Sequence, residues 1–276
     1  MKLGILGLGH VGSRLATLYS PHCELVAYDI KSKTDYPFDE LAECDLTMIC
    51  VGTPQLPNGA ADLSSVRAAL KDLPTELVII RSTVPPGTTA QLSSEFDRTL
   101  LFMPEYVGET SYIAQDWTLF EQNSHFLILG GEVKSRQVVL DLLMPIHGSM
   151  TRILQCSTVE AETIKYMENS YFACKITFVS EFYRFCERMS LDWHLVREGW
   201  LMDPRVERDH TGVFNNGSGY GGRCLPKDVR AIIKMGEGVG HRFQLMEVVD
   251  RINSRCSAAT SFGSEADDEI WPEVIS

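Results

Sequence analysis

Cys224 lies in an unusual stretch of sequence, because residues 217–228 are GSGYGGRCLPKD and include four glycines. Glycines leave backbone N–H groups uncovered and allow a substrate to approach the chain closely. Arg223 and Lys227 are cations, and nearby cations favour the thiolate form of a cysteine. A structural cysteine requires none of these features. The pattern therefore predicts that Cys224 is a nucleophile presented to a substrate.

A lysine and an amide are placed one helical turn apart earlier in the chain. Lys165 and Asn169 are separated by four residues within an expected helix, so both side chains point from one face. An ammonium and an amide placed in this way can stabilise a developing oxyanion. The same spacing also fits an ordinary solvated helix face, and the pair alone does not decide between the two.

Glu105 belongs to MPEYVGE, residues 103–109, directly after an apolar run that is expected to be a strand. Open α/β sheets bind ligands beyond the carboxyl ends of their strands. The polar segments VGTP at 51–54 and RSTVPPGT at 81–88 also follow expected strands. Glu105 is thus placed to act as a base near a cofactor, although a surface or capping carboxylate fits the position equally well.

Gly7, Gly9 and Gly12 form the motif G-x-G-x-x-G between the first expected strand and a helix. The first glycine permits a tight turn, the second lets a pyrophosphate approach the backbone, and the third allows close packing of helix against strand. The next expected strand ends at Asp29, whose carboxylate can accept hydrogen bonds from an adenosine ribose. The motif predicts a dinucleotide site, and a glycine turn in an unrelated α/β fold is the alternative.

The charge near the ribose position indicates NAD as the cofactor. The carboxylate of Asp29 would repel the 2′-phosphate that distinguishes NADP. Lys31 and Lys33 follow closely and leave NADP open.

The elements that would position these residues alternate along the first half of the chain. Short apolar runs typical of buried strands alternate with helical patterns there, which predicts a parallel sheet with crossover helices. The expected strands are KLGIL (2–6), ELVAYD (24–29), LTMICV (46–51), LVIIRS (77–82), LLFMP (100–104), HFLILG (125–130) and MTRILQC (150–156). The predicted fold class is α/β, a Rossmann-type doubly wound parallel sheet followed by a mostly α-helical second domain.

The pattern changes near residue 157, from which apolar residues recur at helical spacing over many turns. Ser157 or Thr158 would cap the first helix, and Glu160 and Glu162 would be favourable in its first turn.

Three regions are therefore expected, with later helices in the second of them. The regions are a NAD-binding Rossmann domain at 1–156, a helical central domain at 157–256 and a polar tail at 257–276. The central domain is expected to include helices at 228–236 and 243–255. The tail is acidic and aperiodic, so it is expected to be mobile.

Composition excludes several classes of protein. The chain has 276 residues and a formal charge of −12 at pH 7, which argues against nucleic acid binding because that needs clustered Lys and Arg. No apolar run approaches the roughly 20 residues that span a bilayer, so no membrane role is expected. The eight cysteines include no C-x-x-C pair, which is typical of a reduced cytoplasmic protein and gives no expected metal site.

Seven motifs occur in an order that resembles the UDP-glucose/GDP-mannose dehydrogenase family. They are GLGHVG (7–12), VGTP (51–54), DLS (62–64), STVPPGT (82–88), PEYVGE (104–109), Lys165 with Asn169, and GYGGRCLPKD (219–228). The combination is specific, and the resemblance covers residue 1 to about 255.

The resemblance implies a four-electron oxidation of a sugar primary alcohol to a uronic acid with two NAD. Cys224 would trap the aldehyde as a thiohemiacetal, which becomes a thioester after a second hydride transfer. Lys165 and Asn169 would stabilise the oxyanions. Three further residues would position water, relay protons or assist hydrolysis of the thioester, namely Thr83, Asp228 and Glu105.

Two binding sets follow from the same resemblance. The cofactor-binding residues would be Gly7, Gly9, His10, Val11, Gly12, Asp29, Val51, Gly52, Thr53, Ser82, Thr83, Glu109 and Lys227. The substrate-binding residues would be Glu105, Tyr106, Val107, Gly108, Lys165, Asn169, Arg205, Tyr220 and Gly221. Glu109 resembles a second glutamate of the family, and Arg205 resembles an arginine lent across a dimer interface. A homodimer is therefore expected, with the helix at 243–255 contributing to it.

The chain departs from the family pattern in ways that affect the substrate more than the reaction. Family members usually continue into a further α/β domain that grips the nucleotide, and this chain stops where that domain would begin. Arg223 stands where serine is commoner in the family. The segment 29–46 is shorter than usual in the family, and the loop 205–224 is a few residues longer. Either a partner chain completes the site, or a smaller sugar or glycoside is oxidised, or the chain is a fragment; the acidic tail favours a naturally short protein.

Two other functions stay open at this stage. A two-electron β-hydroxyacid dehydrogenase would use Lys165 and Asn169 without any role for Cys224. A non-catalytic NAD-binding protein would retain the motifs as remnants. Two NADH per product acid would indicate the thioester route, and one NADH would indicate the two-electron dehydrogenase. NAD binding without NADH formation would indicate the non-catalytic protein.

Overall fold

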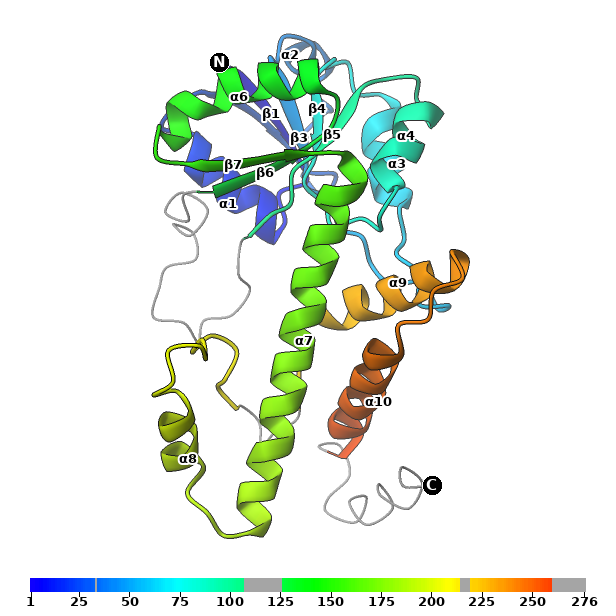
Figure 1. The fold of residues 1–276 in the computed structure, drawn as a ribbon. Coiled ribbons are helices and arrows are strands. Elements are labelled where there is room, and N and C mark those ends of the chain that lie inside the picture. Colours follow the sequence, from blue (N-terminus) through cyan, green and yellow to red (C-terminus); the bar gives the residue numbers. More distant parts are fainter. Residues whose placement is uncertain (33, 107–125, 214–218, 260–276) are drawn as a thin grey trace. The chain divides into compact units, whose positions relative to one another are not determined.

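A seven-stranded sheet forms the framework of the N-terminal part of the chain in the computed structural model (Figure 1). The strand order is β2-β1-β3-β4-β5-β6-β7. The strands are β1 (Lys2–Leu6), β2 (Glu24–Tyr28), β3 (Leu46–Ile49), β4 (Val78–Ile80), β5 (Leu100–Phe102), β6 (Phe126–Gly130) and β7 (Arg152–Cys156). Every residue of β3, β4 and β5 is buried, as expected for strands that are covered on both faces.

The structure describes residues 1–32, 34–106, 126–213 and 219–259. By its internal contacts the chain divides into two compact units, Met1–Tyr166 and Met167–Ser276. The division falls within helix α7 (Thr158–Arg188). The first turns of this helix therefore belong to the sheet unit, whereas the sequence places the boundary just before the helix.

Two strands, β6 and β7, run opposite to the other five. β1 to β5 are parallel to their neighbours, but β6 is antiparallel to β5, through the pair Phe102 and Gly130. β7 is again parallel to β6. The mostly parallel sheet confirms the predicted fold class. An apolar run identifies a buried strand but carries no information on its direction, so the reversal at β6 could not be predicted from the sequence.

Helices cover both faces of the sheet, which confirms the predicted doubly wound arrangement. The other helices of this unit are α1 (His10–Tyr19), α2 (Phe38–Ala42), α3 (Ser64–Lys71), α4 (Thr88–Glu95) and α6 (Val133–His147). Leu15 of α1 and Leu143 of α6 belong to the core on one face. Leu70 of α3, Leu92 of α4 and Ala161 of α7 belong to the core on the other face. The beginning of α7 is thus fixed against the sheet by apolar packing.

Helix α7 begins with a capping box. The backbone N–H of Ser157 donates to Oε2 of Glu160 at 2.7 Å, and the backbone N–H of Glu160 donates to Oγ of Ser157 at 3.2 Å. Such reciprocal bonds satisfy donors that a helix start leaves unpaired. Of the two capping residues considered from the sequence, the structure therefore selects Ser157.

The second unit is mostly helical, as predicted. Besides the remainder of α7 it contains α8 (Trp193–Trp200), α9 (Leu225–Gly238) and α10 (Gln244–Ala259). Sequence reasoning missed α8, although Asp192 is a recognisable cap that accepts from the N–H of His194 at 2.9 Å. Among the helices of the described residues, none is both long and apolar enough to cross a bilayer.

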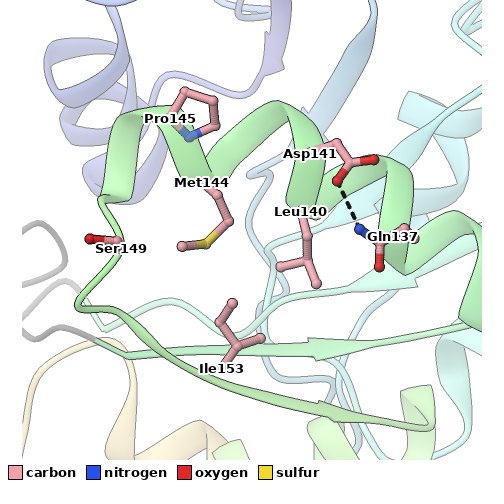
Figure 2. Close-up of a pocket in the computed structure, with 7 residues that line it drawn as sticks. All are labelled: Gln137, Leu140, Asp141, Met144, Pro145, Ser149 and Ile153. Atoms are coloured by element: carbon pink, nitrogen blue, oxygen red, sulfur yellow. Dashed lines mark hydrogen bonds between the residues drawn. The ribbon is translucent and has the colours of Figure 1, made fainter.

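The last strand, β7, has no described strand beyond it. Its side chains are exposed except at its end, and they include Ile153 and Leu154. A groove of about 560 Å³ lies between β7 and α6, where Gln137 donates to Asp141 at 2.7 Å (Figure 2). The residues that line this groove include none of those predicted for a functional site.

Candidate active site

The glycine loop after β1 has the geometry that a dinucleotide requires. Gly7 has φ +91°, and a Cβ there would lie 2.9 Å from the carbonyl of Cys50, so the turn needs glycine. A Cβ on Gly12 would overlap the carbonyl oxygen of Gly7. A Cβ on Gly9 would meet no protein atom within 4 Å. The outer two glycines thus serve packing, while Gly9 leaves open space where a pyrophosphate can approach.

Helix α1 follows the glycine loop directly. Its N-cap, Gly9, provides no side-chain hydrogen bond, and its first turn, which includes His10 and Val11, holds no acidic residue. Free N–H groups and the helix dipole at such an end attract an anion. The residues therefore fit the pyrophosphate of NAD.

Asp29 is held beside this loop by two backbone N–H groups. Lys31 donates to its Oδ1 at 2.9 Å, and Leu8 donates to its Oδ2 at 2.7 Å. These two bonds hold the pKa of Asp29 below its ordinary value, since they favour the ionised carboxylate. Asp29 is thus an ionised acceptor next to the glycine loop, as a ribose contact requires.

The loops that follow β3 and β4 are tied to each other. The hydroxyl of Thr53 donates to the carbonyl of Thr83 at 2.8 Å, and the hydroxyl of Ser82 donates to the carbonyl of Val51 at 2.7 Å. Gly52, between them, has no protein atom within 4 Å of an added Cβ. All five of these predicted cofactor residues therefore lie in one joined region at the carboxyl end of the sheet.

Glu105 and Lys165 come together in the first unit. The Nζ atom of Lys165 lies 3.6 Å from Oε1 of Glu105, and both side chains are buried. The ring of Tyr106 lies 5.0 Å from the same Nζ and also contacts Phe126 edge-on. Tyr106, predicted as a substrate residue, therefore lies against Lys165, where its ring can stabilise the ammonium.

Glu162 was not recognised as a site residue from the sequence. It is wholly buried, and it accepts from the backbone N–H of Gly87 at 2.6 Å and of Thr89 at 2.7 Å. Burial raises the pKa of Glu162 to about 6 in spite of these bonds. Only the E-x-x-K spacing to Lys165 could have drawn attention to it.

In the second unit, Asn169 and Lys227 both bind Asp228. The amide of Asn169 donates to Oδ2 of Asp228 at 2.7 Å, and Nζ of Lys227 lies 2.6 Å from Oδ1. Asp228 is only 1% exposed, so the charge of its carboxylate is balanced inside the fold. Lys227, predicted as a cofactor residue, is engaged in this ion pair.

Cys224 is the N-cap residue of α9, which begins earlier than the sequence indicated. Its side chain is half-buried. The helix dipole at such a position favours a thiolate. Because Asp228 lies in the first turn of the same helix, one element positions the two residues.

The glycine segment before Cys224 is anchored by a hydrogen bond at Tyr220 and has open space beside Gly221. Tyr220 is buried, and its backbone N–H donates to the side-chain oxygen of Asn253 at 2.7 Å. Gly219, at φ +80°, has no room for a Cβ beside the same oxygen. Gly221 is exposed, with no protein atom within 4 Å of an added Cβ. Asn253, which sequence reasoning missed, therefore anchors the segment that carries the cysteine.

Several predicted residues do not join these clusters. Arg205 is mostly exposed and pairs with its neighbour Asp203 at 2.6 Å, rather than with another predicted site residue among those described. Val107, Gly108 and Glu109 lie outside the described residues, as does Lys33. In the described part of the chain, no group of three or more His, Cys, Asp or Glu residues is arranged to hold a metal ion.

Together these features define a Rossmann-type dinucleotide-binding protein with a helical unit that presents a cysteine. Residues 27–143 match the NAD binding domain of the UDP-glucose/GDP-mannose dehydrogenase family, and residues 159–255 match the central domain of that family. The chain belongs to the UDP-glucose/GDP-mannose dehydrogenase family, which confirms the resemblance seen in the motifs. The match to the NAD binding domain also confirms NAD as the cofactor.

Relatives of this chain carry consistent names. It is 30% identical over 259 residues to UDP-glucose 6-dehydrogenase of Pseudomonas aeruginosa, covering 86% of this chain and 56% of the relative. It is 30% identical over 225 residues to UDP-glucose 6-dehydrogenase TuaD of Bacillus subtilis, covering 76% and 46%. A UDP-glucose dehydrogenase structure from the hyperthermophilic archaeon Pyrobaculum islandicum aligns with a TM-score of 0.78 at 27% identity, covering 92% of this chain and 68% of that one. The chain spans about half the length of the curated relatives it matches.

Proposed function

We propose that the protein oxidises the primary alcohol of a sugar to a carboxylate in two NAD-dependent steps. The proposed substrate class is a UDP-sugar, because the relatives above are named UDP-glucose dehydrogenases. The observation that carries the proposal is Cys224 at the N-terminus of α9, one turn before a buried Asp228 that Asn169 binds. A cysteine that only fills space needs no such surroundings.

The proposed chemistry divides the oxidation at Cys224. NAD, when bound, supplies a hydride acceptor for each of the two oxidation steps. Between these steps the thiolate of Cys224 adds to the aldehyde carbon, and the resulting thiohemiacetal oxygen takes up a proton. Loss of the second hydride and of that proton leaves a thioester, and water then releases the carboxylic acid and the thiol.

The charged side chains of both units have distinct proposed roles. The ammonium of Lys165 and the amide of Asn169 stabilise negative charge on the substrate oxygen. Glu105, 3.6 Å from Lys165, accepts a proton from the water that hydrolyses the thioester. Asp228 and Thr83 orient water and relay protons. Glu109 and Gly108 are proposed to contact ligands only on the strength of the family pattern.

The test is the number of NADH formed per acid. With UDP-glucose, wild-type protein is expected to form two NADH per uronic acid, followed by absorbance and product mass. Cys224→Ser is expected to lose the acid product, whereas Cys23→Ser, at a half-buried cysteine that bonds to the carbonyl of Tyr19, should behave as wild type. Full activity with one NADH in Cys224→Ser would instead establish a two-electron dehydrogenase.

A panel of substrates tests which class of sugar the protein oxidises. UDP-glucose, GDP-mannose and simple glycosides should be compared at equal concentration. Preference for the UDP-sugar supports a nucleotide site completed by this chain or by its second copy. Preference for a simple glycoside supports a site built by the loop before Cys224. NAD binding without NADH from any of them would indicate a non-catalytic protein.

A homodimer through α7 is proposed as the working form. Within the second unit, α7 exposes apolar side chains at intervals of three, four or seven residues, namely Met167, Tyr171, Phe178, Phe182 and Phe185. A pocket of about 280 Å³ adjoins this stripe, and Arg205 is among its lining residues. An exposed stripe of this size is typical of an interface, and it supports dimerisation better than the helix at 243–255.

Light scattering tests the dimer. Wild-type protein is expected to have twice the mass of the chain, and Phe182→Asp, in the middle of the stripe, is expected to be monomeric. Leu245→Asp, at an exposed leucine of α10, is the matched control and should stay dimeric. A monomeric wild type with full activity would remove the proposed role of Arg205 across the interface. The cytoplasmic location stays a prediction from the cysteine pattern.

A further inference from the structure

Helix α4 begins without a cap of its own. Its N-cap residue is Gly87, at φ +90°, and no side-chain hydrogen bond caps the helix from within. Glu162 of α7 fills that role, since its two carboxylate oxygens accept from the backbone N–H groups of Gly87 and Thr89 at 2.6 and 2.7 Å. Capping with a buried carboxylate is strong because the charge meets the positive end of the helix dipole.

The segment capped in this way is the one that carries Thr83. At its other end, the carbonyl of Thr83 accepts from Thr53 at 2.8 Å. Between Thr83 and Gly87 lie only Val84, Pro85 and Pro86, and proline fixes φ. The position of Thr83 is therefore determined from two sides, by the sheet and by Glu162.

Lys165 lies three residues after Glu162, on the adjacent turn of α7. Because a helix transmits position and rotation between adjacent turns, anchoring Glu162 also sets where Lys165 meets Glu105. We propose that Glu162 is a positioning residue that fixes Lys165 relative to Glu105 and to the Thr83 segment. This inference rests on the proposed function for its catalytic meaning, while the geometric part stands on the first unit alone.

Glu160 offers a matched control on the same helix. Glu160 is exposed and caps only its own helix through Ser157, whereas Glu162 links two helices. In Glu162→Gln the side chain keeps its size but offers one acceptor oxygen and an N–H donor, so one of the two backbone N–H groups loses its acceptor. In Glu162→Asp the charge remains, but the side chain is shorter by one CH₂ group.

The first measurement needs no turnover. The rate of reductive methylation of Lys165, followed by mass spectrometry on the full chain, is expected to rise severalfold in Glu162→Gln and less in Glu162→Asp. It should be unchanged in Glu160→Gln. Equal rates in all proteins, or an equal rise in Glu160→Gln and Glu162→Gln, would overturn the proposal. If Glu162→Gln does not fold, the comparison of Glu162→Asp with Glu160→Gln decides.

The second measurement links position to rate. In Glu162→Gln, kcat with UDP-glucose is expected to fall by about 10- to 100-fold, the loss that follows a misplacement of about 1 Å. Adding Glu162→Gln to Lys165→Ala should cause no further loss, because the effect acts through the lysine. Additive losses would assign Glu162 a purely structural role. A wild type that forms no NADH would refute the proposed function, and the methylation rates would still test the positioning.

Discussion

Glu162 should make the first unit more stable as the pH falls, which is the reverse of the usual behaviour of a bonded carboxylate. Burial raises the pKa of Glu162 from 4.5 to about 6 in the folded chain. The folded state therefore binds this proton more tightly than the unfolded state does. The resulting stabilisation is fully present below the unfolded pKa of 4.5 and is lost as the pH rises through about 6.

The magnitude follows from that interval. Each pKa unit corresponds to about 1.4 kcal/mol, so an increase from 4.5 to about 6 amounts to about 2 kcal/mol. Glu162→Gln has no titrating group at this position. The difference in unfolding free energy between wild type and Glu162→Gln is therefore expected to shift by about 2 kcal/mol in favour of wild type between pH 7.5 and pH 3.5.

Urea unfolding followed by circular dichroism measures this difference at each pH. Glu160→Gln is the control with the opposite sign, because the hydrogen bonds from Ser157 lower the pKa of Glu160. The stabilisation by Glu160 is present above the unfolded pKa of 4.5 and is lost as the pH falls through the lower folded value. If the Glu162 difference did not change with pH, or became smaller as the pH is lowered, as that of Glu160 should, burial would not dominate the pKa of Glu162.

Three further results are expected. Gly12→Ala should lower the unfolding free energy by about 1–3 kcal/mol through overpacking. Gly9→Ala should keep the melting temperature of wild type and bind NAD more weakly in a fluorescence titration. An equal decrease of the melting temperature in both variants would contradict the assigned roles. Asp228→Ala should cost about 3 kcal/mol in urea unfolding, because a buried ion pair loses one partner, and a loss near zero would mean that the ion pair is absent. At pH 7, Cys224 should be alkylated by iodoacetamide well before Cys44, whose thiol pKa burial raises to about 11. Equal rates at the two cysteines, measured by mass spectrometry of the modified peptides, would contradict the expected difference in their thiolate content.

The cofactor half of the site could be predicted from the sequence because its determinants are local. Gly7, Gly9 and Gly12 lie within one turn, and the structure gives each the expected surroundings. Asp29 follows at the end of the next strand, and its contact with Leu8 spans only 21 positions. The chemical residues could be predicted less directly, since Lys165 of the first unit and Asn169 of the second have a meaning only through the family motifs.

Contacts between distant parts of the chain could not be predicted in this way. The partners of Glu162 lie 75 and 73 positions away, and its own neighbours in sequence indicated only a favourable charge in a first turn. Asn253 is 33 positions from Tyr220. The direction of β6 likewise depends on how the chain returns to the sheet, and not on the apolar run FLILG itself.

The exposed border of the sheet has a practical consequence for work with the purified protein. β7 presents apolar Ile153 and Leu154 at a position where strands of another molecule can add by backbone bonding. Aggregates formed by that route would become larger as the protein concentration rises and would not stop at a dimer. Phe182→Asp would not abolish them. Leu154→Lys should prevent this association between strands. A molecular mass in solution that is still twice that of the chain would then come from contacts between helices.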